Sequence, residues 1–428
     1  MRLLIKNGTL ANPGGLNGRL DVLIEDGVIA AIGASLPEDD AEIMDATGKT
    51  VMPGFVDMHC HLREPGQEFK ETIATGTRSA AAGGFTTVAC MPNTKPVVDN
   101  EAVVKFILDK AQAEGAVRVL PIAAVTKGQE GKELTEMGFL KEAGAVAFSD
   151  DGKPVDNARV MELALRYAKN FGALIISHCE DKHLAEGGVM HEGAMATKLG
   201  LPGIPSTAEE LMVAREILLA ERLNAKVHIA HISTTGSVEL VRQAKSRGVK
   251  VTAETCPHYF AATDELVEGY STATKMNPPL RPEADRQAII AGLADGTIDA
   301  IATDHAPHHA DDKDVEYKLA AFGIVGFETA FGLAMTYLVE PGLLSLEALV
   351  EKMALNPARI LGLEPGLLAE GARADLVIAD LTQKWVVDPS QFHTKGRNTP
   401  FAGWTLRGQV TDTICAGLPV YKEGKIVV

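Results

Sequence analysis

The middle of the chain alternates short apolar segments with alanine-rich segments of helical spacing, and this alternation is what most restricts the fold. Segments such as ETIATGTRSAAAGG, NARVMELALRYAKNFG and SVELVRQAKSRG are typical of helices with glycine stops. Eight strand–helix units in about 310 residues predict a (β/α)8 barrel of TIM type. An open doubly wound sheet would carry a glycine-rich phosphate turn after its first strand, and HCHLREPG stands there instead. The eight segments with the texture of buried strands are FVDMH (55–59), FTTVACM (85–91), VRVLPIAAV (117–125), AVAFSD (145–150), ALIISHC (173–179), VHIAHIS (227–233), VKVTAETC (249–256) and AIATDH (300–305).

The sequence pattern at both ends of the chain predicts short strands without intervening helices. Residues 1–52 contain LLIKNGTLA, DVLIEDGVIAAIG and AEIMDATGKTVM, with Asn-Gly and Asp-Gly turns, and the texture returns after residue 366 in ADLVIADL, KWVVDP and GKIVV. A chain of 428 residues is also longer than one hydrophobic core usually serves. We therefore expect a small β-sandwich-like domain from residues 1–52 and 366–428, and a barrel domain from residues 53–365.

Charge, the length of apolar runs and cysteine content exclude several classes of protein and of partner. The formal charge of -16 opposes binding to nucleic acid and to anionic membranes. No apolar run reaches the roughly 18 to 20 residues that span a bilayer, and no signal-like segment opens the chain. Five cysteines at irregular spacing, without a Cys-x-x-Cys pair, predict neither a disulfide framework nor a thiolate zinc cluster. The expected location is the reduced cytoplasm.

Polar residues stand where the predicted barrel strands end. The carboxyl ends of barrel strands meet at one rim, which is where TIM barrels carry their chemistry. Any one histidine at such a position is more often a structural or surface group than a ligand, but the joint pattern points to a metal site. The residues at strand ends are His59, His61, Asn93, Asp151, His178, His231 and Asp304.

Four of these histidines and two aspartates form a nitrogen and oxygen donor set suited to zinc. His59 and His61 alternate with Cys60, so both imidazoles face one side of an extended strand. Six ligands exceed one tetrahedral site, and we expect two ions: His59, His61 and Asp304 on one, His178 and His231 on the other, and Asp151 between them. Asp150 is a rival for the bridge, and Lys153 a weaker one. Two such ions would supply hydroxide at neutral pH.

The chain resembles the cyclic amidohydrolases, and specifically the bacterial type I dihydroorotases of the amidohydrolase superfamily. The resemblance rests on HCHLREPG, MPNTKP, FSDDG, SHCE, AHIST, KMNPPLR and TDHAPH, in this order along nearly the whole chain. It implies the interconversion of L-dihydroorotate and N-carbamoyl-L-aspartate in pyrimidine synthesis, and gives the same six metal ligands. Asp304 would also be the general base and acid. The substrate-binding residues that it implies are Arg63, Asn93, Asn277 and His308, with the backbone of Phe322 and Gly323.

The chemistry of Arg63 supports the implied substrate independently. Its planar guanidinium suits a carboxylate, which dihydroorotate has and which hydantoin and dihydrouracil lack. Asn93 can donate to the same group. Two dications, two carboxylates and a hydroxide leave about one positive charge, which would attract an anion.

Several alternatives stay open at this point. The chain could be another cyclic amidohydrolase, either a hydantoinase or dihydropyrimidinase or an allantoinase, or a non-catalytic scaffold homologue, which would have eroded ligands. The resemblance implies a homodimer and leaves association with aspartate transcarbamoylase open. We expect the charged segment 308–318 to be a solvated loop rather than a moving lid, and His183, His191 and His258 to be structural or surface groups.

Overall fold

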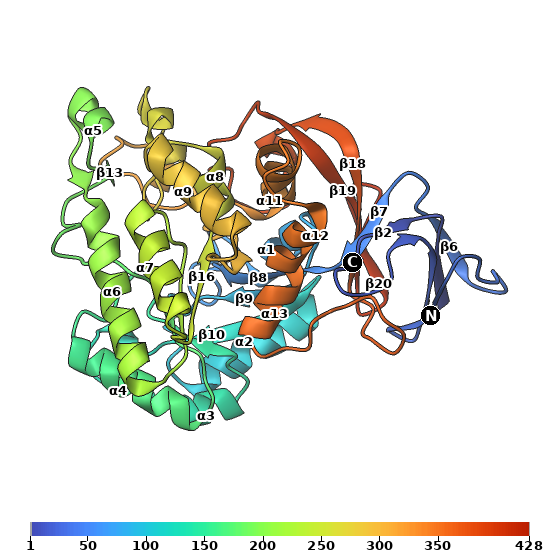
Figure 1. The fold of residues 1–428 in the computed structure, drawn as a ribbon, viewed down its shortest axis with the longest axis horizontal. Helices are drawn as coiled ribbons and strands as arrows, with labels where there is room; N and C mark the ends of the chain where they lie inside the picture. The colour runs from blue at the N-terminus through green and yellow to red at the C-terminus, as the bar shows by residue number, and fades with distance from the viewer. Residues whose placement is uncertain (1, 428) are drawn as a thin grey trace.

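The computed structural model describes residues 2–427, and its largest part is a barrel of eight parallel strands surrounded by helices (Figure 1). Seven of the barrel strands lie within a predicted segment at a shorter length, and β8 extends one residue beyond the predicted 55–59. The strands are β8 (Phe55–Cys60), β9 (Phe85–Cys90), β10 (Arg118–Ala123), β11 (Ala147–Phe148), β12 (Ile176–Ser177), β15 (Val227–Ile229), β16 (Val251–Thr255) and β17 (Ala300–Ile301).

The barrel consists of two curved four-stranded sheets joined at two narrow contacts. One sheet has the order β11-β10-β9-β8 and the other the order β12-β15-β16-β17. A parallel bridge between Phe148 and Ile175 joins β11 to β12, and another between Cys60 and His305 joins β8 to the segment that follows β17. These bridges close the ring and confirm the predicted fold class.

The helices cover the outside of the barrel, and side-chain caps start several of them. Thr72 caps α1 through the amide of Thr75, and Asn157 caps α4 through two amides. The longer helices are α1 (Ile73–Ala82), α2 (Glu101–Glu114), α4 (Ala158–Asn170), α6 (Ser206–Leu223), α7 (Thr235–Ser246), α9 (Glu283–Ala294) and α11 (Phe327–Ala334). Shorter helices are α3 (Met137–Glu142), α5 (Ala194–Leu199), α8 (Pro257–Ala261), α10 (Ala310–Lys313), α12 (Leu346–Val350) and α13 (Asn356–Ile360), with wider π-helical turns η4 (Met335–Val339) and η5 (Glu351–Leu355). Within residues 2–427, no helix combines the length and apolar composition needed to cross a bilayer.

The two ends of the chain build a β-rich part beside the barrel, as predicted (Figure 1). Side chains from both of its sheets, including Ile5, Ile24, Val51 and Ile378, form one buried cluster, so the sheets face each other as a sandwich. The first sheet has the order β5-β4-β1-β6, formed by β1 (Arg2–Lys6), β4 (Asp21–Glu25), β5 (Val28–Gly33) and β6 (Glu42–Asp45). The second has the order β21-β20-β19-β18-β7-β2-β3, formed by β2 (Thr9–Leu10), β3 (Gly18–Arg19), β7 (Thr50–Pro53), β18 (Leu376–Val386), β19 (Thr405–Cys415), β20 (Leu418–Lys422) and β21 (Lys425–Ile426).

The carboxyl-terminal strands differ in detail from the prediction. ADLVIADL and KWVVDP read as two strands, but β18 runs through both, with an irregular register between Asp380 and Lys384. The carboxylate of Asp380 accepts hydrogen bonds from the amides of Thr382 and Gln383, which explains the turn-like sequence inside a continuous strand. β19 and β20 were not predicted. The predicted last strand ends at Val428, which lies outside the described residues. The domain boundaries near residues 52 and 366 stay a prediction.

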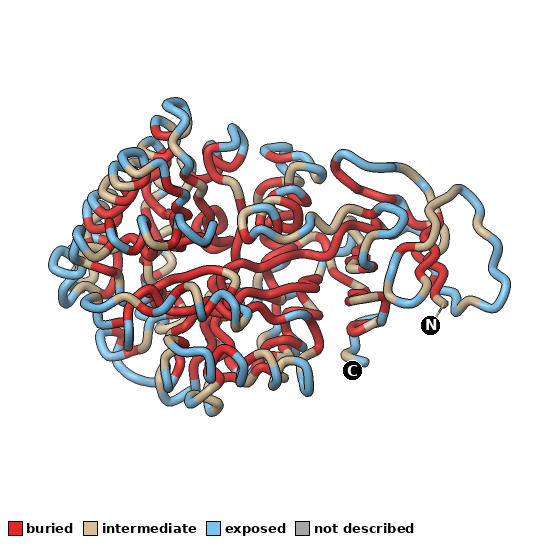
Figure 2. The backbone as a smooth tube through the Cα atoms, turned by 90° about the horizontal axis from the view of Figure 1, so that it is seen from below, coloured by how far each residue is buried: buried red, intermediate tan, exposed pale blue. Residues whose placement is uncertain are grey.

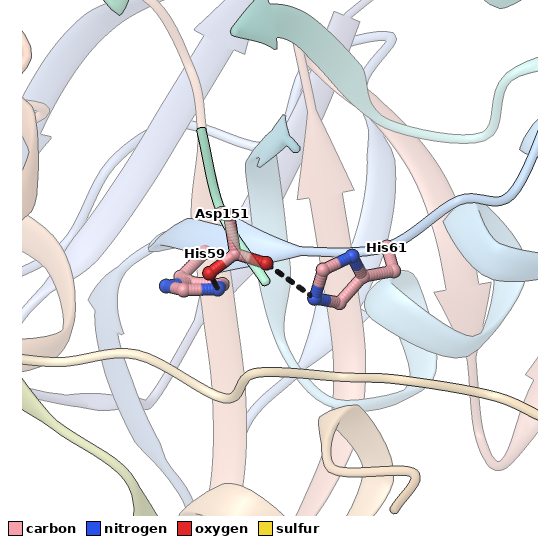
Figure 3. Close-up of side chains that lie close together, drawn as sticks. All are labelled: His59, His61 and Asp151. Carbon is pink, nitrogen blue, oxygen red and sulfur yellow. Dashed lines mark ion pairs between the residues drawn. The ribbon is translucent and has the colours of Figure 1, made fainter. Parts of the chain in front are cut away.

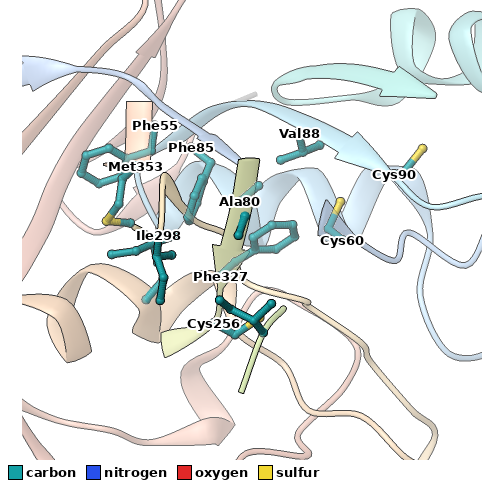
Figure 4. Packing of buried hydrophobic residues seen from close by; sticks show 14 of the residues in the cluster. Phe55, Cys60, Ala80, Phe85, Val88, Cys90, Cys256, Ile298, Phe327 and Met353 are labelled. Carbon is teal, nitrogen blue, oxygen red and sulfur yellow. The ribbon is translucent and has the colours of Figure 1, made fainter. Parts of the chain in front are cut away.

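Two layers of hydrophobic side chains stabilise the barrel, and buried residues occur along much of its backbone (Figure 2). Small and medium side chains from strands around the ring, such as Met58, Ala89 and Ile122, contact one another and fill its interior. Larger side chains pack between strands and helices (Figure 4). There the ring of Phe85 lies 5.8 Å from that of Phe55 and 5.5 Å from that of Phe327.

Replacing Phe85 by alanine tests this outer layer. Phe85 is fully buried, so we expect Phe85→Ala to lower the free energy of unfolding by about 3 to 5 kcal/mol, as measured by denaturant titration. Phe139→Ala is the control, because Phe139 is 60% exposed and its loss is expected to cost less than about 0.5 kcal/mol. Equal effects of the two changes would contradict this account of the packing.

Candidate active site

The six predicted metal ligands meet at the carboxyl end of the barrel. We call His59, His61, Asp151, His178, His231 and Asp304 the rim cluster. The carboxylate of Asp151 lies between the imidazoles of His59 and His61 (Figure 3). One oxygen is 3.4 Å from Nε2 of His59 and the other is 3.5 Å from Nε2 of His61.

The same carboxylate faces a second pair of histidines. Oδ1 of Asp151 lies 3.4 Å from Nδ1 of His178 and 3.6 Å from Nε2 of His231, and these two nitrogens are 2.9 Å apart. Asp304 completes the group from the other side, since its Oδ1 lies 3.0 Å from Nε2 of His61. Two sets of three potential ligands therefore share Asp151.

The donor atoms of the rim cluster fit a divalent metal. All six side chains are buried, and within the described chain Nε2 of His59 has no hydrogen-bond partner. Buried polar atoms without partners are rare, and an imidazole nitrogen that faces carboxylates and other imidazoles is a typical ligand atom for a cation such as zinc. The cluster is therefore compatible with bound metal.

Electrostatics agree with a cluster built to hold positive charge. Burial alone would lower the pKa of His178, but its hydrogen bond and charge interaction with Asp151 raise that pKa to about 10. Burial would raise the pKa of Asp304, yet the hydrogen bond with His61 and the charges of nearby imidazoles lower it to about 2. A cation bound among these atoms would satisfy the same attraction.

Hydrogen bonds behind two ligands fix the direction of their rings. Nδ1 of His61 lies 2.9 Å from Oδ1 of Asn93, and Nδ1 of His59 lies 2.8 Å from Oε1 of Glu254. If each Nδ1 carries the proton of its hydrogen bond, each Nε2 can present a lone pair to a bound cation. This is the tautomer that a metal ligand needs.

The predicted substrate-binding residues line one cavity with the rim cluster. The cavity, of about 220 Å³, is the active-site cavity below. Nε of Arg63 donates to the carbonyl of Pro307 over 3.2 Å, and its Nη2 lies 3.4 Å from Nε2 of His308 in the same lining. Nε2 of His308 lies 2.8 Å from the carbonyl oxygen of Phe322. The predicted residues in the lining are Arg63, Asn93, Asn277, His308, Phe322 and Gly323.

The rival ligands of the fourth strand lie elsewhere. Asp150 accepts hydrogen bonds from the amides of Val125 and Thr126, at 2.8 and 3.1 Å, and so points away from the cavity. Lys153 is exposed. A larger cavity of about 360 Å³ between α11 and β19 contains His393 bonded to Glu328, but it has no cluster of imidazoles and carboxylates like that of the rim.

The charged segment 308–318 is more firmly held than a solvated loop. Lys313 is buried, and its Nζ donates to the carbonyls of Thr272, Lys275 and Ala321. Tyr317 is buried as well, while most of the remaining residues from 309 to 318 are exposed. The segment therefore forms part of the wall beside His308.

Comparison with known proteins connects this site to a family. A dihydroorotase from Pelotomaculum thermopropionicum is 59% identical to this chain over 424 residues and covered over 99% of both chains. A dihydroorotase from Acetivibrio thermocellus is 56% identical over 422 residues, which cover 98% of this chain and 99% of that one. The chain belongs to the dihydroorotase family. Family models described as Dihydro-orotase-like and as Amidohydrolase family match residues 48–237 and 212–427.

Solved hydantoinase structures share the fold of this dihydroorotase-family chain. The L-hydantoinase (dihydropyrimidinase) from Arthrobacter aurescens has a TM-score of 0.89 at 28% identity, covering 100% of this chain and 97% of that one. A D-hydantoinase (dihydropyrimidinase) from Thermus sp. has a TM-score of 0.84 at 27% identity, covering 99% and 96%. The family identifies the chain as a hydrolase that acts on a small molecule.

Glu254 is a buried carboxylate behind this dihydroorotase-family site that sequence reasoning missed. Its Oε2 lies 3.3 Å from Nε2 of His228, whose Nδ1 lies 2.8 Å from the hydroxyl of Thr252. Burial would raise the pKa of Glu254, but hydrogen bonds with His228 and His59 lower it to about 2. The sequence does contain a signal for this residue. Glu254 is an acidic residue inside the predicted strand VKVTAETC, so it needs buried partners, and the predicted strand VHIAHIS contains one in His228.

Changing Glu254 tests its support of His59. We expect Glu254→Gln to weaken metal binding about 10-fold and Glu254→Ala about 100-fold, because His59 loses the partner that fixes its tautomer and basicity. Chelator competition on the purified proteins measures this affinity. Glu162→Gln is the control, because Glu162 is also buried but pairs with arginines on the outside of α4. Metal affinity equal to that of the control in both Glu254 variants would contradict the role.

Proposed function

We propose that the chain catalyses the reversible hydrolysis of the cyclic amide of L-dihydroorotate to N-carbamoyl-L-aspartate, a step of pyrimidine synthesis. The observation that carries the proposal is the place of Arg63, which lines the same cavity as the rim cluster. A guanidinium binds the ring carboxylate of dihydroorotate through paired hydrogen bonds, and hydantoin and dihydrouracil offer no such group. The name of the relatives at 54–59% identity supports this substrate.

We further propose two zinc ions for the rim cluster. His59, His61 and Asp304 would hold one, His178 and His231 the other, and Asp151 both. The two overlapping ligand sets that share Asp151 support this number. When bound, such ions polarise a carbonyl group and make water nucleophilic near neutral pH.

Asp304 is the residue to which we assign the proton transfers. Its low pKa makes it a carboxylate at neutral pH, and it lines the cavity beside His61. This carboxylate takes a proton from the attacking water and returns it to the ring nitrogen when the carbon–nitrogen bond breaks. The reverse sequence at the same oxygen closes the ring.

The cavity wall opposite the rim cluster holds the substrate in this proposal. Arg63 and Asn93 bind the ring carboxylate, while Asn277, His308 and the backbone of residues 322 and 323 bind the rest of the ring. Oδ1 of Asn277 is buried without a hydrogen-bond partner in the described chain, which leaves it for a ligand. A Cβ atom on Gly323 would lie 2.8 Å from the Cβ atom of Ala306. Only glycine therefore lets the backbone at this position pack so closely against Ala306.

The buried Glu254 revises the charge of the site. The count from the sequence included the carboxylates of Asp151 and Asp304 and gave about one positive charge. A third buried carboxylate lowers that sum to about zero. Arg63 is then the cation that attracts the substrate.

Another cyclic amidohydrolase activity is the second candidate, because the solved structures most like this chain include hydantoinases. A scaffold without activity is disfavoured, since all six ligand residues are present and meet. A homodimer, association with aspartate transcarbamoylase and a cytoplasmic location stay predictions from the sequence.

A substrate panel with an Arg63 variant tests the activity. We expect hydrolysis of dihydroorotate to exceed that of hydantoin, dihydrouracil and allantoin. Arg63→Lys should lower kcat/KM for dihydroorotate about 10-fold to 100-fold, mainly through KM, because the paired hydrogen bonds are lost while the charge is kept. Arg78→Lys on the exposed face of α1 is the control. Faster turnover of hydantoin than of dihydroorotate by the wild-type protein would favour the second candidate.

The adjacent aspartates of the fourth strand test the metal arrangement. We expect Asp151→Ala to bind fewer than two metal ions and to lose activity, because both ligand sets include this carboxylate. Asp150→Ala should keep its metal and lose only stability, since Asp150 bonds to the backbone of residues 125 and 126. Metal analysis by mass spectrometry reports both. Full metal content in Asp151→Ala would refute the shared ligand.

A further inference from the structure

A second cavity, of about 360 Å³, adjoins the active-site cavity across His308, which lines both. Its walls come from three separate parts of the chain: residues 272–273, residues 308–314 and residues 395–398. We call this cavity the basic vestibule.

Two cations of the vestibule have no carboxylate partner in the described chain. Nζ of Lys395 donates to the carbonyl of Glu68 over 2.8 Å. Nη1 of Arg397 donates to the carbonyls of Thr394 and Gly396. Carbonyl groups satisfy these donors without cancelling their charge, so both residues contribute a full positive charge to the cavity.

The other charges around the vestibule are two lysine–aspartate pairs and the carboxylate of Asp311. Lys313 faces Asp314 within the lining, although burial lowers the pKa of Lys313 to about 7 and so makes its charge partial. Close by, Nζ of Lys70 lies 3.0 Å from a carboxylate oxygen of Asp312, and the two charges cancel. The carboxylate of Asp311, which lies 3.2 Å from Nδ1 of His309, offsets one of the two positive charges of Lys395 and Arg397, so a surplus of about one remains, on a chain whose net charge is -16.

A third cavity, on the other side of the active site, has the opposite balance. It shares Gly152 with the active-site cavity and has a volume of about 400 Å³. Two lysines in its lining, Lys153 and Lys182, stand against three carboxylates, those of Glu130, Asp156 and Glu180, and Lys182 is paired with Asp156. Of the two flanking cavities, only the vestibule is electrostatically suited to an anion.

We propose that the basic vestibule is the binding site through which carboxylate-bearing substrate and product reach and leave the active site, and that Lys395 and Arg397 attract them there. This inference rests on the proposed function. Dihydroorotate carries one carboxylate and N-carbamoyl-L-aspartate carries two. The vestibule therefore has an anionic group to attract in either direction of the reaction.

The two directions of the reaction provide the test. We compare Lys395→Gln/Arg397→Gln with Lys226→Gln/Lys250→Gln, which removes two exposed lysines just before β15 and β16, at the opposite end of the barrel. kcat and kcat/KM are measured for both compounds from about 0.01 M to about 0.5 M salt, since screening is weak at the first and strong at the second.

At low salt we expect kcat/KM of the vestibule variant to fall about 4-fold for both compounds, because the equilibrium constant fixes the ratio of the two kcat/KM values. Coulomb's law in water gives about a twofold change for each pair of unit charges roughly 10 Å apart. The losses should shrink at high salt, with kcat changed less than about twofold.

Three results would overturn the inference. The first is a vestibule variant that behaves like the control variant, and the second is a loss of kcat/KM that is as large at high salt as at low salt, which would indicate a structural effect. Both leave the proposed function intact. The third is a wild-type protein that turns over neither compound, which would overturn the proposed function and the vestibule together.

Discussion

Closure of the barrel is the constraint on which the site depends. The two sheets of the ring meet at two single bridges, Phe148 with Ile175 and Cys60 with His305. Both bridges stand within three residues of members of the rim cluster, so each brings together predicted ligands that lie far apart in the sequence. One joins the strand of Asp151 to the strand of His178, and the other joins the strand of His59 and His61 to that of Asp304. Without closure, the carboxylate of Asp151 would not have imidazoles on both sides.

Residues that follow strand ends could be predicted from the sequence, because the period of a strand and the rule of the barrel rim place them without knowledge of packing. All eight strands and the convergence of the rim cluster follow from that rule. Glu254 does not, because its role depends on two histidines that reach it from neighbouring strands. The burial of Lys313 depends likewise on carbonyl groups of a distant loop. The sequence did not predict that β18 is continuous, because Asp380 is typical of a turn and its side chain accepts hydrogen bonds from the two following amides of Thr382 and Gln383.

The likeness to hydantoinases separates the fold from its specificity. A backbone that matches a hydantoinase with a TM-score of 0.89 carries ring-opening chemistry that several cyclic amides could use. In the proposed function, what distinguishes the substrate lies in the cavity wall, where Arg63 contributes a charge that the rim cluster, with Glu254 included, does not supply. Specificity in this chain is therefore an electrostatic property of a few side chains placed on a shared scaffold.

The pairing of β7 with β18 sets an order of events during synthesis. Residues 50–53 leave the ribosome long before their partners at 376–379, and the whole barrel is made in the interval. Until then β7 has one free edge and can pair only with β2, so the nascent chain exposes half of an unfinished sheet. The complete sandwich is therefore the last part of the molecule that can form. A chain whose synthesis stops within β19 would have a complete barrel and an unpaired strand edge, which can pair with other chains.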